Sequence, residues 1–111
     1  MSALNTYIVL FAAACLEAGG DALVRVGLRE TAGPWRLALF ALGAVVLLAY
    51  GLAVNAPAWD FGRVLGVYVS LFFLVAQAIN WFAFGVSPSL STAVGGALIV
   101  GGGLVMTFGR A

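Results

Sequence analysis

The sequence predicts an all-α integral membrane protein with four transmembrane helices, in a single domain that covers residues 1–111. Of its residues, 64% are hydrophobic and 8% are charged, whereas soluble domains average about 45 to 50% apolar and about 25% charged residues. Four apolar segments, each near the roughly 20 residues that one bilayer crossing needs, account for nearly the whole chain. We therefore expect a multi-pass protein of the cell inner (plasma) membrane, with no residues left for a soluble domain.

The hydrophobic runs and the turns between them place the four helices. A proline lies in each of the three intervening turns, at Pro34, Pro57 and Pro88, and proline resists the continuation of a helix. The expected helices cover residues 7–26, 35–54, 62–84 and 90–108. Because the turns are short, consecutive helices should form antiparallel hairpins.

The arginines give this chain only a slight preference for one orientation in the membrane. Three lie near the first and third turns (Arg25, Arg29 and Arg36), and two lie near the second turn and the C-terminus (Arg63 and Arg110). Basic residues favour the cytoplasmic side. Two arrangements are open. Dual insertion would let two opposite copies form an antiparallel dimer around one cavity, whereas a fixed orientation would keep the first three arginines in the cytoplasm.

The composition argues against an enzyme and against nucleic-acid binding. The sequence contains no histidine, and its one cysteine, Cys15, lies in the first apolar run, where it is expected to be a small core residue. Metal-ligand spacing, a glycine-rich phosphate loop, a set of serine, histidine and aspartate, and a basic patch are all missing. We therefore expect no metal, no cofactor, no catalytic residues and no nucleic-acid partner.

The charged residues that could carry chemistry lie in the first predicted helix. Glu17 lies about 10 residues into a helix of roughly 20 and is the deepest charge in the sequence. At about 100° per residue, Asp21 and Arg25 share its helix face. A charge near the bilayer centre costs at least ~2.5 kcal/mol, so it usually faces a partner or a wet cavity.

The spacing of the two carboxylates separates their expected roles. Two ionised carboxylates four residues apart, at roughly 6 Å, repel each other by about 2.8 kcal/mol at an effective dielectric of about 20. We therefore expect Asp21 to pair with Arg25, and Glu17 to exchange protons or bind a cation. The alternative for both carboxylates is a structural polar network that joins helices.

Polar and aromatic residues of the second and third helices are candidates for a cavity lining. Tyr68 is expected to line the cavity, whereas Gln77 and Asn80 are assigned to hydrogen bonds between helices, a common role of such residues in membranes. Gly43 and Tyr50 are seven residues apart and so share a face of the second helix. They mark its expected cavity side, although Tyr50 could instead lie at the membrane interface.

The fourth predicted helix is rich in small residues. Ala93, Ala97 and Gly101 are spaced four residues apart, so they share one helix face. Small residues allow two backbones to approach closely within a membrane. We assign Ala97 and Gly101 to dimer packing, with contacts inside the monomer as the alternative.

Four short apolar helices with a deep glutamate in the first resemble the small multidrug resistance transporters of the drug/metabolite transporter superfamily. The YnfA-type branch is the closer match, and the similarity spans nearly the whole chain. It is carried by the segments Leu16-Glu17-Ala18-Gly19-Gly20, Leu28-Arg29-Glu30, Tyr50-Gly51 before Pro57, Phe61-Gly62-Arg63-Val64, and Gly85-Val86 with Pro88. The chain differs from this branch at Asp21 and Arg25, where the branch carries uncharged residues.

The resemblance implies a dimeric, proton-coupled membrane exporter of small or amphipathic cations, in which Glu17 binds protons and substrate in turn and Tyr68 assists. The implied partners are the cation, the proton, membrane lipid and a second copy of the chain, with a heterodimer as the alternative. Two other functions remain open. The chain could be a non-transporting binding or structural subunit of a small membrane hetero-oligomer, or a flippase of lipid-linked substrates.

Overall fold

The computed structural model describes residues 2–109 as four α-helices joined by short turns. The helices are α1 (Ala3–Arg29), α2 (Trp35–Val54), α3 (Phe61–Phe82) and α4 (Leu90–Phe108). The bounds of α2 and α4 are those that the sequence predicts, and α3 differs from its predicted span by one or two residues at each end. Each helix is long and apolar enough to cross a membrane.

Side-chain caps fix the start of three helices. Ser2, Asp60 and Ser89 each accept a hydrogen bond from the backbone N–H group three residues further along. This bond satisfies one of the free donors at the start of a helix. The cap at Ser2 explains why α1 begins before the predicted start at residue 7, because Asn5 and Thr6 continue the helix without adding a hydrophobic signal.

An arginine from α2 holds the end of α1. Arg36 Nε donates to the backbone oxygens of Gly27 at 2.9 Å and Thr31 at 3.2 Å. A terminal nitrogen of the same side chain donates to the backbone oxygen of Leu28 at 3.3 Å. The last carbonyls of a helix lack partners inside it, so this side chain supports α1 beyond its predicted end at residue 26. Gly33 completes the turn with a φ of 75°, which favours glycine.

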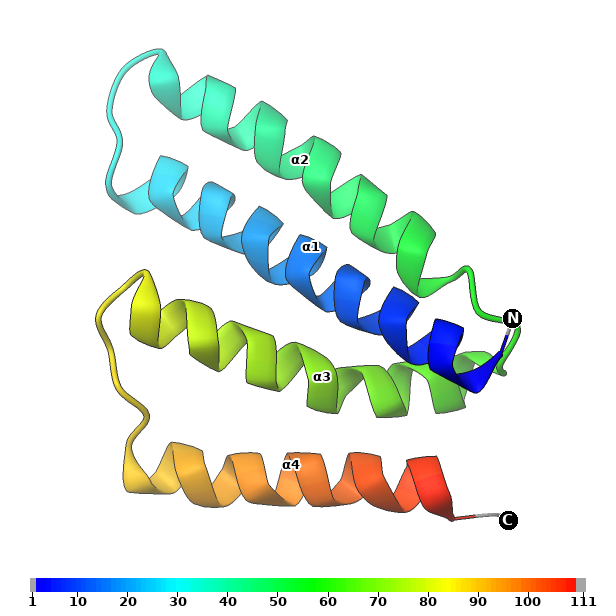
Figure 1. The fold of residues 1–111 in the computed structure, drawn as a ribbon. Helices are drawn as coiled ribbons and strands as arrows, with labels where there is room; N and C mark the ends of the chain where they lie inside the picture. Colours follow the sequence, from blue (N-terminus) through cyan, green and yellow to red (C-terminus); the bar gives the residue numbers. More distant parts are fainter. Residues whose placement is uncertain (1, 110–111) are drawn as a thin grey trace.

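The four helices lie in one row in the order α2, α1, α3, α4 (Figure 1). Among the residues that the structure describes, α4 packs on α3 alone, and α1 packs on both α2 and α3. The molecule is correspondingly flat, with extents of 52 × 34 × 19 Å. A closed four-helix bundle would bring α4 against α1 or α2. This single row instead leaves several helix faces without a protein neighbour.

The helix ends on the two sides of the molecule carry different numbers of arginines. The start of α1, the turn between α2 and α3, and the end of α4 lie on the same side (Figure 1, right), and Arg63, near the start of α3, belongs to this side. Arg25, Arg29 and Arg36 lie toward the opposite side. Of the predicted three against two, residues 2–109 contain three against one, because Arg110 lies outside the described residues.

Glycines bring α1 and α2 into close contact. A methyl group on Gly20 would lie 2.8 Å from the side chain of Leu47, and one on Gly43 would lie 2.8 Å from the side chain of Val24. Both glycines are therefore packing positions with no room for a larger residue. The expectation that Gly43 marks the cavity side of α2 is wrong, because α1 fills the space beside it.

Candidate functional site

Glu17 and Tyr68 meet where α1 contacts α3. The Tyr68 hydroxyl donates a hydrogen bond to Glu17 Oε1 at 2.7 Å and lies 3.3 Å from a second acceptor, the backbone oxygen of Ala13. Tyr68 is 4% exposed, and Glu17 is half-buried. The structure thus brings together the two residues that the family resemblance associates with proton and substrate binding.

Small side chains of α1 permit this contact. Ala13, Ala14 and Ala18 are buried, and the first two belong to the core cluster that also contains Tyr68. Because an alanine side chain ends at Cβ, α3 approaches closely enough for the tyrosine hydroxyl to reach the carboxylate. Glu17 lies near the middle of the 27-residue α1, which is the depth at which a charge in a membrane needs a partner.

Three aromatic rings form a wall beside the carboxylate, and we call Tyr50, Tyr68 and Phe72 the aromatic wall. The ring centroids of Tyr50 and Tyr68 are 5.7 Å apart, and those of Tyr68 and Phe72 are 6.0 Å apart in a stacked arrangement. The predicted cavity residue Tyr50 therefore contacts the Glu17 site from α2. An aromatic face attracts cations, so the wall and the carboxylate together suit an organic cation.

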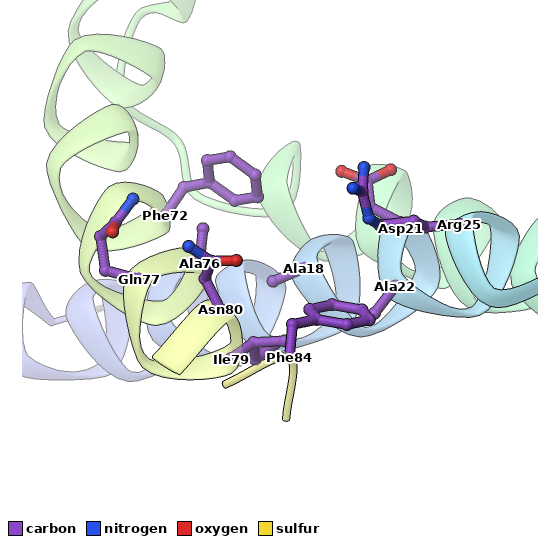
Figure 2. Close-up of a pocket in the computed structure, with 10 residues that line it drawn as sticks. All are labelled: Ala18, Asp21, Ala22, Arg25, Phe72, Ala76, Gln77, Ile79, Asn80 and Phe84. Atoms are coloured by element: carbon purple, nitrogen blue, oxygen red, sulfur yellow. The ribbon is translucent and has the colours of Figure 1, made fainter. Parts of the chain in front are cut away.

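An open groove of about 430 Å³ continues from the aromatic wall along α1 and α3 (Figure 2). Its charged, polar and aromatic lining residues are Asp21, Arg25, Phe72, Gln77, Asn80 and Phe84. Phe72 belongs to both the wall and the groove, so the groove adjoins the site of Glu17.

Asp21 and Arg25 both face this groove from α1 (Figure 2). The guanidinium carbon of Arg25 lies 5.8 Å from the centre of the Phe84 ring. This cation–π contact connects α1 to the turn after α3. The pairing of Arg25 with Asp21 that the sequence predicts stays a prediction.

The polar residues of α3 have roles that differ from the predicted ones. Gln77 and Asn80, assigned to hydrogen bonds between helices, line the groove. Ser70 joins two helices instead, because its hydroxyl donates to the backbone oxygen of Ile99 in α4 at 2.8 Å.

Sequence reasoning missed Phe72 and Phe84 as lining residues. Phe72 follows Tyr68 by four residues, a spacing that keeps two side chains near one face of a helix. The spacing is visible in the sequence, but phenylalanine in an apolar helix gives no sign of whether it faces a groove or lipid. Phe84 also lies beyond the end of α3, so its return toward Arg25 depends on the turn.

Within the described part of the chain, no other helix covers Ala97 or Gly101. Ala97 is exposed, and a methyl group on Gly101 would have nothing within 4 Å. The contacts between α4 and α3 use other glycines. A methyl group on Gly96 would lie 2.5 Å from the Phe73 ring, and Gly103 lies against Ser70. The predicted dimer residues are therefore not engaged in this packing, and their role in a dimer stays a prediction.

Four helices that can each cross a membrane, with a carboxylate half-buried between two of them, define a multi-pass membrane protein. Within residues 2–109, no group of three or more histidine, cysteine, aspartate or glutamate side chains is placed to hold a metal ion. The chain belongs to the YnfA/UPF0060 family, because the family model described as "Uncharacterised BCR, YnfA/UPF0060 family" matches residues 3–111. This membership confirms the YnfA-type resemblance of the sequence.

Relatives in several bacteria are similar to this chain over most of their length. A UPF0060 membrane protein of Kineococcus radiotolerans is 40% identical over 111 residues, which cover 96% of this chain and 95% of the relative. Another, from Nocardia farcinica, is 39% identical over 82 residues, or 73% of this chain and 69% of the relative. The UPF0060 membrane protein YfjF of Bacillus subtilis is 31% identical over 106 residues, or 95% and 94%. No solved structure matches the chain.

Proposed function

We propose that the protein is a proton-coupled exporter of small or amphipathic cations, in which Glu17 exchanges a proton for the substrate. The observation that carries this proposal is the 2.7 Å hydrogen bond from Tyr68 to Glu17 near the middle of α1. This bond supplies one donor to the carboxylate and leaves its other lone pairs for a proton or a cation. The proposal places the family beside the small multidrug resistance transporters in the drug/metabolite transporter superfamily.

Competition at a single carboxylate supplies the coupling in this proposal. Ionised Glu17 and the aromatic wall bind the cation through charge attraction and cation–π contacts. Protonation of Glu17 removes the charge attraction, and the cation leaves. A site that holds either species, but not both, exchanges them across the membrane when it opens alternately to the two sides.

Asp21 and Arg25 have supporting roles in this scheme. Asp21 adds a negative charge one helical turn beyond Glu17 and attracts cations into the groove. Its pairing with Arg25 offsets that charge, so that Glu17 remains the carboxylate for which protons and cations compete. Breaking such a pair inside a membrane protein leaves an uncompensated charge, which is strongly unfavourable.

The exporter operates as a homodimer in this proposal. One copy is a single open row in which Glu17 is half-buried and α4 contacts α3 alone among residues 2–109. A second copy, packed through Ala97 and Gly101, would complete the enclosure of the substrate. An antiparallel arrangement would make the two openings of the cavity equivalent. A heterodimer with a related chain satisfies the same requirement.

A transport assay in proteoliposomes tests this function. With an acidic interior, vesicles that contain the wild-type protein should accumulate tetraphenylphosphonium as protons leave. Glu17→Gln should abolish the uptake, because glutamine keeps the size of the side chain but cannot ionise. Glu30→Gln, at the exposed end of α1, is the matched control and should transport like the wild type. Uptake by Glu17→Gln would show that Glu17 is not the exchanging carboxylate, and no uptake of any small organic cation by the wild type would favour the binding subunit or the flippase.

A further inference from the structure

The groove beside Glu17 carries a pair of opposite charges that a site for a simple cation does not need. Asp21 and Arg25 line it from α1, and Gln77 and Asn80 line it from α3 (Figure 2). Within residues 2–109, no hydrogen bond of the structure uses a side chain of these four residues. Polar groups at membrane depth need water, a ligand or another protein chain as a partner.

The positive charge in the groove is positioned by an aromatic ring. The guanidinium of Arg25 lies over Phe84 at 5.8 Å, and Arg25 is exposed rather than buried. A guanidinium that rests its face on a ring keeps N–H donors at its edge for a carboxylate. Because a guanidinium has five N–H donors, Arg25 can bind the anionic end of a ligand while it also pairs with Asp21 in the proposed scheme.

The spacing of the charges along α1 sets the length of that ligand. At about 1.5 Å of rise per residue, Arg25 lies about 12 Å from Glu17 along the helix axis and about 6 Å from Asp21. A ligand whose cationic group binds at Glu17 reaches Arg25 only when several atoms separate its two charges. An α-amino acid, with one carbon between its charges, is too short. Gln77 and Asn80 offer amide donors and acceptors to polar atoms between the two ends.

We propose that the groove is a substrate subsite for amphipathic zwitterions, in which Glu17 and the aromatic wall bind the cationic group and Arg25 binds a carboxylate. This inference deepens the proposed function and rests on it, because Glu17 binds the cationic group in both. It adds a substrate class, since a simple cation gains nothing from Arg25 and is repelled by it.

A pair of matched ligands tests the zwitterion subsite. Trimethylammonio-octanoate carries both charges, and its methyl ester carries only the positive one. Calorimetric titration of the detergent-purified protein gives a dissociation constant for each. The wild type should bind both. Arg25→Gln should weaken binding of the zwitterion by about tenfold or more, the effect of losing one charge-assisted contact. The ester should bind Arg25→Gln at least as tightly as the wild type.

Control variants separate the role of Arg25 from a general effect of charge. Arg29→Gln removes an exposed arginine one turn further along α1 that does not line the groove, and it should bind both ligands like the wild type. Arg25→Lys keeps the positive charge and should keep most of the preference for the zwitterion. If Arg25→Gln does not fold, Arg25→Gln combined with Asp21→Asn replaces it, because the double variant leaves no single charge without a partner.

The zwitterion subsite would be overturned if Arg25→Gln weakened the binding of the zwitterion and of the ester equally, or if Arg29→Gln weakened binding of the zwitterion as much as Arg25→Gln does. It would also be overturned if the wild type bound the ester but not the zwitterion. The proposed function fails by a different result, which is binding of the ester to Glu17→Gln as tightly as to the wild type.

Discussion

The Tyr68 hydroxyl is the side-chain group that positions the carboxylate of Glu17 in the proposed mechanism. A hydrogen bond to a charged group contributes about 1.5 to 3 kcal/mol. This one is 2.7 Å long, and its donor residue is 4% exposed, so bulk water does not readily replace it. Because the hydroxyl donates to the carboxylate, it holds Glu17 Oε1 beside the aromatic wall, where the proposed cation binds.

Removal of this hydroxyl should weaken cation binding. Tyr68→Phe keeps the ring that stacks on Phe72 but loses the donor that holds the Glu17 carboxylate in place. Because a hydrogen bond to a charged group contributes about 1.5 to 3 kcal/mol, the dissociation constant of the cation should rise by about tenfold or more. Titration with tetraphenylphosphonium measures this constant.

Tyr50→Phe is the matched control for this change. Tyr50 contacts Tyr68 through its ring, and its hydroxyl makes no hydrogen bond to Glu17 among the side-chain bonds of residues 2–109. Its removal should raise the dissociation constant much less. Equal weakening in the two variants would show that the hydrogen bond to Glu17 does not have the role assigned to it.

For the helices, hydropathy and turn residues predict the spans well and the ends of α1 poorly. The spans of α2 and α4 follow directly from apolar runs between proline-containing turns. The extra turns of α1 depend on the Ser2 cap and on the Arg36 side chain, which reaches back from α2. Hydropathy carries neither signal, because both are polar contacts between particular atoms.

The contacts within the site were harder to predict than its central residue. Glu17 stands out because it is the deepest charge, but the hydrogen bond to Tyr68 joins residues 51 apart in the sequence. Which face of a helix meets a neighbour depends on packing that a single sequence does not show. Gly43 illustrates this, since a small residue suits a cavity and a close helix contact equally well, and here α1 occupies the space.

The two faces of α4 should respond differently to the same substitution. Gly101→Leu adds a side chain where nothing lies within 4 Å, so the protein should insert and fold, while close packing of a second copy is blocked. Gly96→Leu is the control, because a side chain there meets the Phe73 ring and should disrupt the monomer. Crosslinking in membranes measures the dimer, and thermal unfolding in detergent measures the monomer. Undiminished crosslinking of Gly101→Leu would place the interface elsewhere.

For the whole molecule, the flat row of helices requires partners on its open faces. Lipid satisfies exposed apolar side chains, of which α2 and α4 carry many, but it does not satisfy Asp21 or Arg25 along the groove. Polar groups inside a membrane protein face a bundle interior or a water-filled cavity. A second copy that covers the groove would create such a cavity, and the small arginine bias would allow the copy to be inverted.

Dual topology predicts that a reporter fused to the C-terminus is found on both sides of the membrane. The expected cause is the slight arginine bias, and two added lysines in the turn between α2 and α3 should place that turn, and the C-terminus with it, in the cytoplasm. A pair of compartment-specific reporters measures the distribution. A single location for the unmodified protein would be incompatible with an antiparallel homodimer, and it would leave the heterodimer as the arrangement to test.

If Glu17 holds either a proton or a cation but not both, protons should be released when the cation binds, and they can be counted. Weakly buffered, detergent-purified protein is mixed with saturating tetraphenylphosphonium, and a pH indicator reports the release. The wild type should release up to one proton per bound cation at low pH and none once Glu17 is already ionised. Glu17→Asp should release protons with a shifted midpoint, and Glu17→Gln should release none. Proton release that survives in Glu17→Gln but disappears in Asp21→Asn would contradict the claim and assign the exchange to the other carboxylate.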